Sequence, residues 1–206
     1  TEGLLFSALI TIGIGLLLLL ITRNRKREIK MRDGYLTVVM GWLSMVIFGT
    51  LPYLLTQSLV SYSDALFETM SGFTATGATI VQDIEALPKS IILWRSLTHW
   101  LGGMGIIVLA VAILPLLGIG GVQLFSAEAT AVGGDKLHPR ISYTAKRLWY
   151  IYVGFTVLEA LMLAFAGMSV FDAINHSMST MASGGFSTRN ESLAYWNNSP
   201  MIQYLS

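Results

Sequence analysis

Two segments 108 positions apart contain residue types that can build a cation site from backbone carbonyls. Residues 61–79 read SYSDALFETMSGFTATGAT, and residues 169–187 read SVFDAINHSMSTMASGGFS. Each begins with Ser-x-x-Asp, a helix start in which the Ser side chain accepts a backbone N–H and the acid favours the positive helix end. A short helix of about ten residues is therefore expected in each copy, followed by extended backbone rich in small residues. The identical positions are Ser61, Asp64, Ala65, Met70, Ser71 and Gly77 in the first copy, and Ser169, Asp172, Ala173, Met178, Ser179 and Gly185 in the second.

The chemistry that this pattern favours is coordination of a potassium-sized cation. Backbone carbonyls can replace the hydration shell of the ion, Gly permits the dihedral angles that aim them inward, and the negative helix C-terminus points at the ion. Residues 74–77 and 182–185, which follow the two expected helices, carry no charged side chain, which disfavours a ring of carboxylates. The candidate filter residues are Thr74, Ala75, Thr76, Gly77, Ala182, Ser183, Gly184 and Gly185.

Three other interpretations stay open from the residues. The two segments could be external loops packed on a helical bundle, although unrelated loops have no reason to share a cap, a length and a terminal Gly. An intramembrane serine hydrolase could use Ser183 with His99 or His176, but the Gly-x-Ser-x-Gly elbow is absent and Ala75 lies opposite Ser183 in the repeat. A helical scaffold without transport is the third. We expect no enzymatic activity.

The elements that must position these segments are membrane helices. Of the 206 residues, 53% are hydrophobic and 12% are charged, and the apolar residues fall in long blocks. At about 20 apolar residues per crossing, the chain has room for four or five crossings. The expected spans are residues 3–22, 35–55, 91–117 and 148–167. The two segments are too short to cross, so we expect an all-α integral membrane protein with two re-entrant pore helix and filter loops.

The distribution of charge predicts the orientation. Ten of the 13 Lys and Arg residues fall in residues 23–32 and 136–147, two loops on the same side of the predicted membrane. By the positive-inside rule that side is the cytoplasm, and the pore loops are external. The outer acids are expected to raise the local cation concentration. They are Asp64, Glu68, Asp83 and Glu85.

A few polar residues within the spans need an explanation. For Glu159, a structural hydrogen bond is favoured over a role in the cation path, because a charged group inside a membrane is costly. For Arg95 and His99, we expect snorkelling at the interface or pairing with an outer acid. Backbone exposed at Gly102, Gly103 and Gly105 is expected to permit close helix packing.

Four stretches carry a resemblance to a known family: FETMSGFTATGAT, LTHWLGGMGIIVLAVAILPLLGIGG, HPRISYTAKRLWYIY and FDAINHSMSTMASGGFST. Together they resemble the membrane subunit of the Trk/Ktr/HKT superfamily of potassium transporters, most closely the bacterial Trk type, over the whole chain. The resemblance implies a pore of four covalently linked helix, pore-loop, helix units, each with a key filter Gly. Gly77 and Gly185 match the first two, so the chain is expected to be a fragment, or to assemble from two copies.

The resemblance also implies an organisation and partners. Residues 1–34 would form an N-terminal membrane helix and basic loop, 35–117 the first pore unit, 118–146 a cytoplasmic connector and 147–206 the second unit, truncated after its pore loop. Potassium is the expected transported ion, with no organic cofactor and no nucleic-acid partner. A homodimer in the bacterial inner membrane, with a cytoplasmic nucleotide-binding regulatory subunit, is implied.

Overall fold

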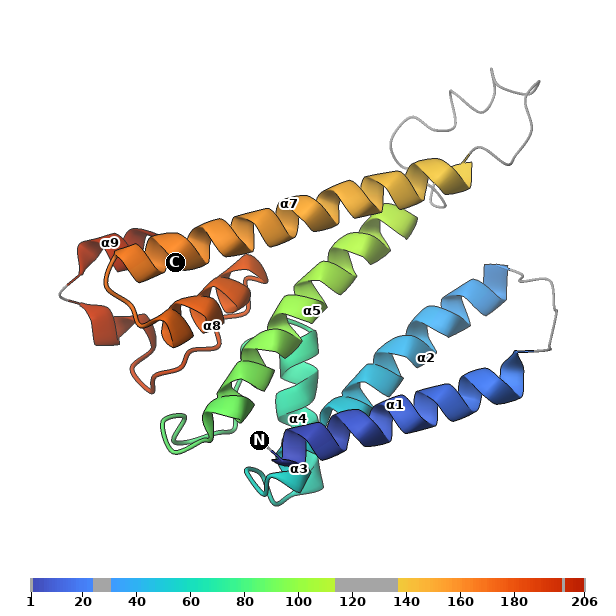
Figure 1. The fold of residues 1–206 in the computed structure, drawn as a ribbon, viewed down its shortest axis with the longest axis horizontal. Helices are drawn as coiled ribbons and strands as arrows, with labels where there is room; N and C mark the ends of the chain where they lie inside the picture. The colour runs from blue at the N-terminus through green and yellow to red at the C-terminus, as the bar shows by residue number, and fades with distance from the viewer. Residues whose placement is uncertain (1, 24–30, 114–136, 198, 206) are drawn as a thin grey trace.

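The computed structural model describes residues 2–23, 31–113, 137–197 and 199–205, and the regular structure within these ranges is helical. Figure 1 shows long rods at one end of the molecule and short helices at the other. The helices are α1 (Glu2–Thr22), α2 (Met31–Gly49), α3 (Leu51–Leu55), α4 (Tyr62–Phe73), α5 (Lys89–Ile113), α7 (Leu137–Phe165), α8 (Val170–Met181), the 3-10 helix η2 (Ser192–Trp196) and α9 (Pro200–Leu205).

Three stretches in the described part of the chain are long and apolar enough to cross a membrane, namely Glu2–Thr22, Leu36–Leu55 and Thr144–Phe165. They agree with the predicted spans at residues 3–22, 35–55 and 148–167. The second runs from α2 into α3 across a break at Thr50, where Pro52 lacks the N–H that a continuous helix needs. The remaining predicted span coincides with α5, and its last residues, 114–117, lie outside the described residues.

The two segments predicted to be re-entrant contain α4 and α8, which have 12 residues each. At about 1.5 Å per residue each helix is roughly 18 Å long, too short to cross about 30 Å of hydrocarbon. Their matched alanines occupy equivalent core positions. Ala65 packs with Tyr53 and Ile91, and Ala173 packs with Leu163 and other buried apolar side chains. Each short helix is therefore anchored by the core of its own unit.

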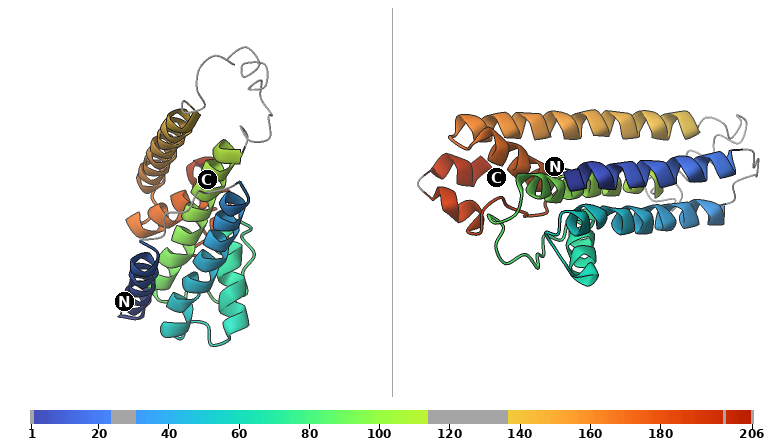
Figure 2. Two further views of the ribbon diagram at one scale, coloured as in Figure 1. Left: turned by 90° about the vertical axis from the view of Figure 1, so that its right-hand side faces the viewer. Right: turned by 60° about the horizontal axis from the view of Figure 1, so that its bottom comes forward.

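The helix ends that flank the two basic segments gather at one end of the molecule. The C-termini of α1 and α5 and the N-termini of α2 and α7 lie at this end, while α3, α8 and α9 lie at the other (Figures 1 and 2). The predicted arrangement, with basic segments opposite the pore loops, fits this geometry. The division at residues 34, 117 and 146 stays a prediction, and most of the connector lies outside the described residues.

The predicted Ser-x-x-Asp cap forms in one copy and not in the other. At α8 the Ser169 hydroxyl accepts the Asp172 N–H at 3.1 Å and donates to the Asp172 carboxylate at 2.7 Å. At α4 the Ser61 side chain makes no capping bond and instead pairs with the Ser63 hydroxyl at 2.7 Å. The prediction for Ser61 was wrong because Ser63, present only in the first copy, offers a nearer partner.

This difference gives a testable contrast. Ser169→Ala is expected to reduce the free energy of unfolding by about 1 kcal/mol, the usual value of an N-cap side chain, because it leaves a helix N–H without its acceptor. Ser61→Ala is expected to change stability by less than about 0.5 kcal/mol. Denaturant titration of the full-length protein in detergent measures both, and equal losses would contradict the assignment of the cap to Ser169 alone.

Candidate functional site

Both short helices end in the same hydrogen-bonded turn. A backbone N–H donates to a carbonyl five residues earlier, and the preceding N–H donates to one three residues earlier, which is the Schellman motif. These bonds are Thr76 to Ser71 (3.0 Å), Ala75 to Gly72 (3.0 Å), Gly184 to Ser179 (2.9 Å) and Ser183 to Thr180 (2.7 Å). The chain thus leaves the helix at the same position in each copy, which confirms the repeat at the level of individual bonds.

Two positions in each candidate filter have left-handed backbone. The φ angles are 53° at Ala75 and 77° at Gly77, and 54° at Ser183 and 80° at Gly185. The need for Gly at the second position was predicted, and the structure agrees. The left-handed conformation of Ala75 and Ser183, which costs a residue with a Cβ about 1–2 kcal/mol, was missed. It follows from the helix stop, since the residue after the C-cap of a Schellman motif is left-handed.

The two candidate filter strands lie against each other at their glycines. A Cβ added to Gly77 would overlap the carbonyl oxygen of Gly184 and lie 3.8 Å from the Cα of Gly185. A Cβ added to Gly185 would meet nothing within 4 Å in the described part of the chain. The close approach therefore requires glycine at position 77, whereas Gly185 faces open space.

The carbonyl groups of the candidate filter residues have no hydrogen-bond donor in the described part of the chain. Their N–H groups at Thr76 and Gly184, in contrast, are held by the preceding helices. A carbonyl oxygen that lacks a protein donor can be satisfied by water or by a cation. Among the described residues, no group of three or more His, Cys, Asp and Glu side chains is placed to hold a metal, so the backbone is the candidate ligand for an ion.

A buried ion pair lies behind the first strand. The Nε of Arg95 donates to Glu68 Oε1 at 2.8 Å, and the two side chains are 1% and 0% exposed. The same carboxylate accepts the Thr79 hydroxyl at 2.9 Å and the Ile80 N–H at 3.0 Å. Glu68, on α4, is therefore tied to the chain that leaves the first filter.

This network corrects two of the expectations drawn from sequence. Arg95 and His99 are fully buried, so neither snorkels to an interface; the alternative, pairing with an acid, holds for Arg95. Glu68 is also buried, so it does not belong with the exposed outer acids Asp83 and Glu85. The hydropathy pattern did not predict the burial and pairing of Arg95 and Glu68, because the two residues lie far apart in sequence. The available signal was a single Arg in an otherwise apolar span, since such a residue needs a counter-charge.

The second copy has a neutral version of the same contact. His176 occupies the position that matches Glu68, and Ser187 matches Thr79. The His176 Nε2 lies 3.4 Å from the Ser187 Oγ, as the Glu68 carboxylate lies beside the Thr79 hydroxyl. Each short helix is thus linked by a side chain to the residue two positions after the Gly of its candidate filter.

The geometry gives the hydrolase interpretation no support. His99 Nδ1 lies 3.1 Å from the Ser179 Oγ, and His176 is paired with Ser187, so neither imidazole hydrogen-bonds to Ser183. A nucleophilic serine needs a base within hydrogen-bond reach. Ser183 lines a cavity of about 330 Å³ together with His176, but its backbone position is explained by the helix stop that it shares with Ala75.

Two glycines of α5 allow this helix to pack closely against the ends of the two short helices. A Cβ on Gly102 would overlap the Phe73 carbonyl at the end of α4, and a Cβ on Gly103 would lie 2.9 Å from the Ala182 Cβ. The predicted close approach is therefore confirmed, with the end of each short helix as the partner. Glu159 of α7 is buried, and its Oε1 has no hydrogen-bond partner among the described residues, so the structural hydrogen bond favoured for it stays a prediction.

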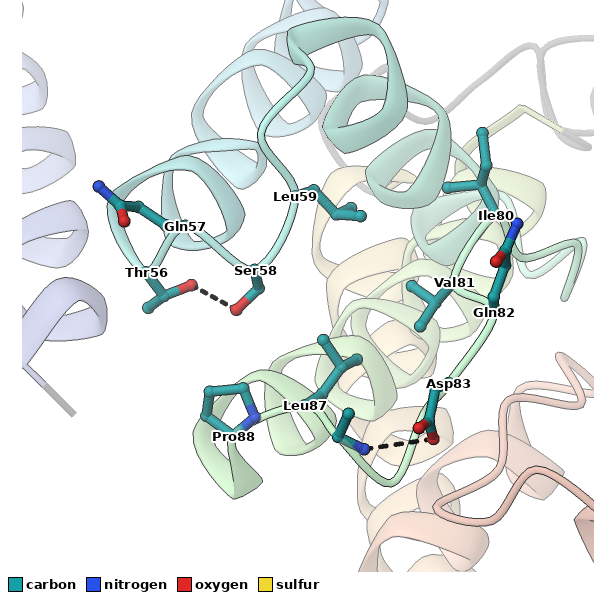
Figure 3. A pocket seen from close by; sticks show the side chains of 11 residues that line it. Thr56, Gln57, Ser58, Leu59, Ile80, Val81, Gln82, Asp83, Leu87 and Pro88 are labelled. Carbon is teal, nitrogen blue, oxygen red and sulfur yellow. Dashed lines mark hydrogen bonds between the residues drawn. The ribbon is translucent and has the colours of Figure 1, made fainter.

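The loops that follow the two filters are tied to each other. The Asn190 Oδ1 accepts the Ile84 N–H at 2.7 Å, and its Nδ2 donates to Asp83 at 2.9 Å. This bond from Asn190, with the N–H groups of Ala86 and Glu85, holds the pKa of Asp83 below its ordinary value. The Asp83 side chain also lines a hollow of about 430 Å³ between residues 56–59 and 80–88, where Figure 3 shows its bond to a backbone N–H.

Known proteins resemble this chain over nearly all of its length. The Trk system potassium uptake protein TrkH of Halomonas elongata is 49% identical over 191 residues, which are 92% of this chain and 40% of the relative. The protein of the same name from Escherichia coli K12 is 48% identical over 195 residues, 94% of this chain and 40% of the relative. The chain thus spans about 40% of the length of these relatives.

A solved structure and a protein family agree with these relatives. The crystal structure of the potassium transporter TrkH from Vibrio parahaemolyticus matches with a TM-score of 0.84 and 42% identity, covering 99% of this chain and 40% of that one. The family described as TrkH, cation transport protein, matches residues 5–206. The chain therefore belongs to the TrkH family of cation transport proteins.

Proposed function

We propose that this chain forms the first two pore-loop units of a potassium uptake protein of the Trk type. The observation that carries the proposal is the pair of matched backbones, each with a Schellman turn, a left-handed Gly and carbonyls that have no donor among the described residues. The curated relatives, which carry the name potassium uptake protein, support the same ion.

In this proposal a potassium ion loses water and is coordinated by carbonyls of residues 74–77 and 182–185. The C-termini of α4 and α8 lie immediately before these carbonyls, and their negative ends favour a cation there. Two further units, outside this chain, would complete the ring on the side that Gly185 leaves open. The ion is the transported substrate, and no organic cofactor is invoked.

The surroundings of the pore follow from the charge distribution. The chain is part of a membrane protein, and we place it in the inner membrane. The C-terminal end of α1 and the N-terminal end of α7, where the basic residues gather, then face the cytoplasm. The pore loops are then external, where the exposed carboxylates Asp83 and Glu85 attract cations. The assembly that we infer is a homodimer with a cytoplasmic nucleotide-binding regulatory subunit.

The test is ion uptake by the full-length protein in cells that lack their own potassium uptake. Wild-type protein is expected to restore growth at low potassium and to take up potassium in preference to sodium. The control is the same cell with an empty vector. Full-length protein that reaches the membrane and takes up no potassium, even when a regulatory subunit is co-expressed, would contradict the proposal.

A further inference from the structure

Helix α5 forms a common wall behind both candidate filters. It contacts α4 on one side and α8 on the other, and Figure 1 shows it passing between them. Arg95 and His99 lie one turn apart on this helix, and both are buried. Because each side chain contacts residues from the second unit, α5 joins the two filters as well as supporting its own.

Arg95 forms hydrogen bonds with residues at the outer end of the first strand. Its Nη2 donates to the Thr79 hydroxyl at 3.1 Å, and its Nε donates to Glu68 at 2.8 Å. Glu68 in turn accepts the Ile80 N–H at 3.0 Å. The position of Thr79, two residues after Gly77, is therefore set by the guanidinium group and its counter-ion together.

The same guanidinium group reaches the second strand. Its Nη1 donates to the carbonyl of Ser187 at 3.5 Å, and its Cζ lies 4.2 Å from the centroid of the Phe186 ring. Phe186 immediately follows Gly185, and its ring also stacks on His99 at 3.8 Å. A planar guanidinium can bind a carboxylate, donate a hydrogen bond to a second acceptor and stack on a ring at the same time, which an ammonium group cannot do.

We propose that Arg95 is a positioning residue for ion selectivity, which holds the outer ends of both filter strands at a fixed separation. The proposal rests on the proposed function, since it concerns the same filter. Arg95 touches no ion itself. It acts through Thr79, Ser187 and Phe186, each of which lies one or two residues beyond a filter Gly.

A purely structural role for Arg95 makes a different prediction. If Arg95 only neutralises the buried Glu68, then Arg95→Lys keeps the charge and should keep selectivity. If Arg95 positions both strands, Lys is insufficient, because its compact ammonium group cannot reach Glu68, the Ser187 carbonyl and the face of Phe186 together. The ratio of potassium to sodium uptake separates the two roles, because a lower amount of protein reduces the uptake of both ions equally.

The experiment compares wild type, Arg95→Lys and Arg189→Lys in the full-length protein, with potassium and sodium uptake and the potassium KM measured. Arg189 is the matched control, since its side chain pairs with Glu85 at 3.6 Å and with Asp172 at 3.8 Å. Its bond to the Ser187 hydroxyl comes from the backbone N–H, which Arg189→Lys keeps. Arg95→Lys is expected to lower the potassium to sodium ratio by roughly fivefold to tenfold and to raise the KM, while Arg189→Lys changes neither.

Thr79→Val is the second variant, because it removes the hydroxyl shared by Arg95 and Glu68 and keeps the ion pair. It is expected to lower the same ratio, and it decides the question if Arg95→Lys does not reach the membrane. Unchanged ratios in the variants that do reach the membrane, beside a selective wild type, would overturn the role of Arg95. A wild type without potassium uptake would overturn the proposed function instead.

Discussion

Gly77→Ser in the full-length protein is expected to reduce potassium over sodium discrimination by about tenfold or more. The residue has φ of 77°, and a Cβ there would overlap the Gly184 carbonyl oxygen of the neighbouring strand. The overlap is with backbone, so no side chain can rotate away to relieve it. One of the two strands must move, and the carbonyls that we propose to replace the hydration shell of potassium move with it.

Gly185→Ser is the matched variant for this prediction. Its φ of 80° imposes the same backbone strain, but a Cβ there meets nothing within 4 Å in the described part of the chain. We expect a smaller loss of discrimination than at Gly77 if backbone strain alone acts there, and an equal loss if a strand from outside this chain fills the space. Uptake of both ions, normalised to protein in the membrane, measures the two. Wild-type selectivity in a well-expressed Gly77→Ser variant would contradict the filter assignment.

Glu68→Leu is expected to reduce the free energy of unfolding by about 3–5 kcal/mol, the usual cost of leaving a buried charge without its partner. The Arg95 side chain is 1% exposed, and Glu68 is its counter-ion at 2.8 Å. The double variant Glu68→Leu with Arg95→Met removes both charges and is expected to recover part of this stability, because no buried charge is left unpaired while the Thr79 hydroxyl and the Ile80 N–H still lack their acceptor. Denaturant unfolding of the purified full-length protein in detergent measures each variant.

The exposed ion pair in the outer loops serves as the control. Glu85 and Arg189 are 3.6 Å apart and are 44% and 31% exposed. Glu85→Ala is therefore expected to change stability by less than about 1 kcal/mol. A Glu68→Leu variant as stable as Glu85→Ala would show that the buried pair contributes little. A double variant less stable than Glu68→Leu would contradict the account of an unpaired charge.

The repeat was the part of this molecule that sequence could predict well. Matching Gly77 to Gly185 predicted two short helices and a Gly requirement, because these depend on local backbone physics. The extended backbone expected after each helix is interrupted, since two residues in each candidate filter are left-handed. The membrane-spanning helices could also be predicted, since the length of an apolar stretch decides whether it can cross a membrane. The left-handed conformation of Ala75 and Ser183 was accessible in principle, because it follows from the helix stop.

Contacts between distant segments could not be predicted in the same way. Arg95 looked like an interfacial residue because hydropathy describes each helix by itself, whereas its partners Glu68 and Ser187 lie 27 and 92 positions away. Ser61 looked like a cap because its spacing to Asp64 matches that of Ser169, and only the neighbouring Ser63 distinguishes the two. Burial and pairing depend on the assembled fold, and a single sequence gives little information about them.

The bond between Ile84 and Asn190 has a consequence for how the protein is made. Its two residues are 106 positions apart, and a ribosome adding about 5–20 residues per second needs roughly 5–20 s to cover that distance. Until then the Ile84 N–H lacks its acceptor, and Asp83 accepts only from the backbone N–H groups of Glu85 and Ala86. The loop after the first candidate filter therefore gains these two bonds only once the second short helix and the loop after it have been synthesised.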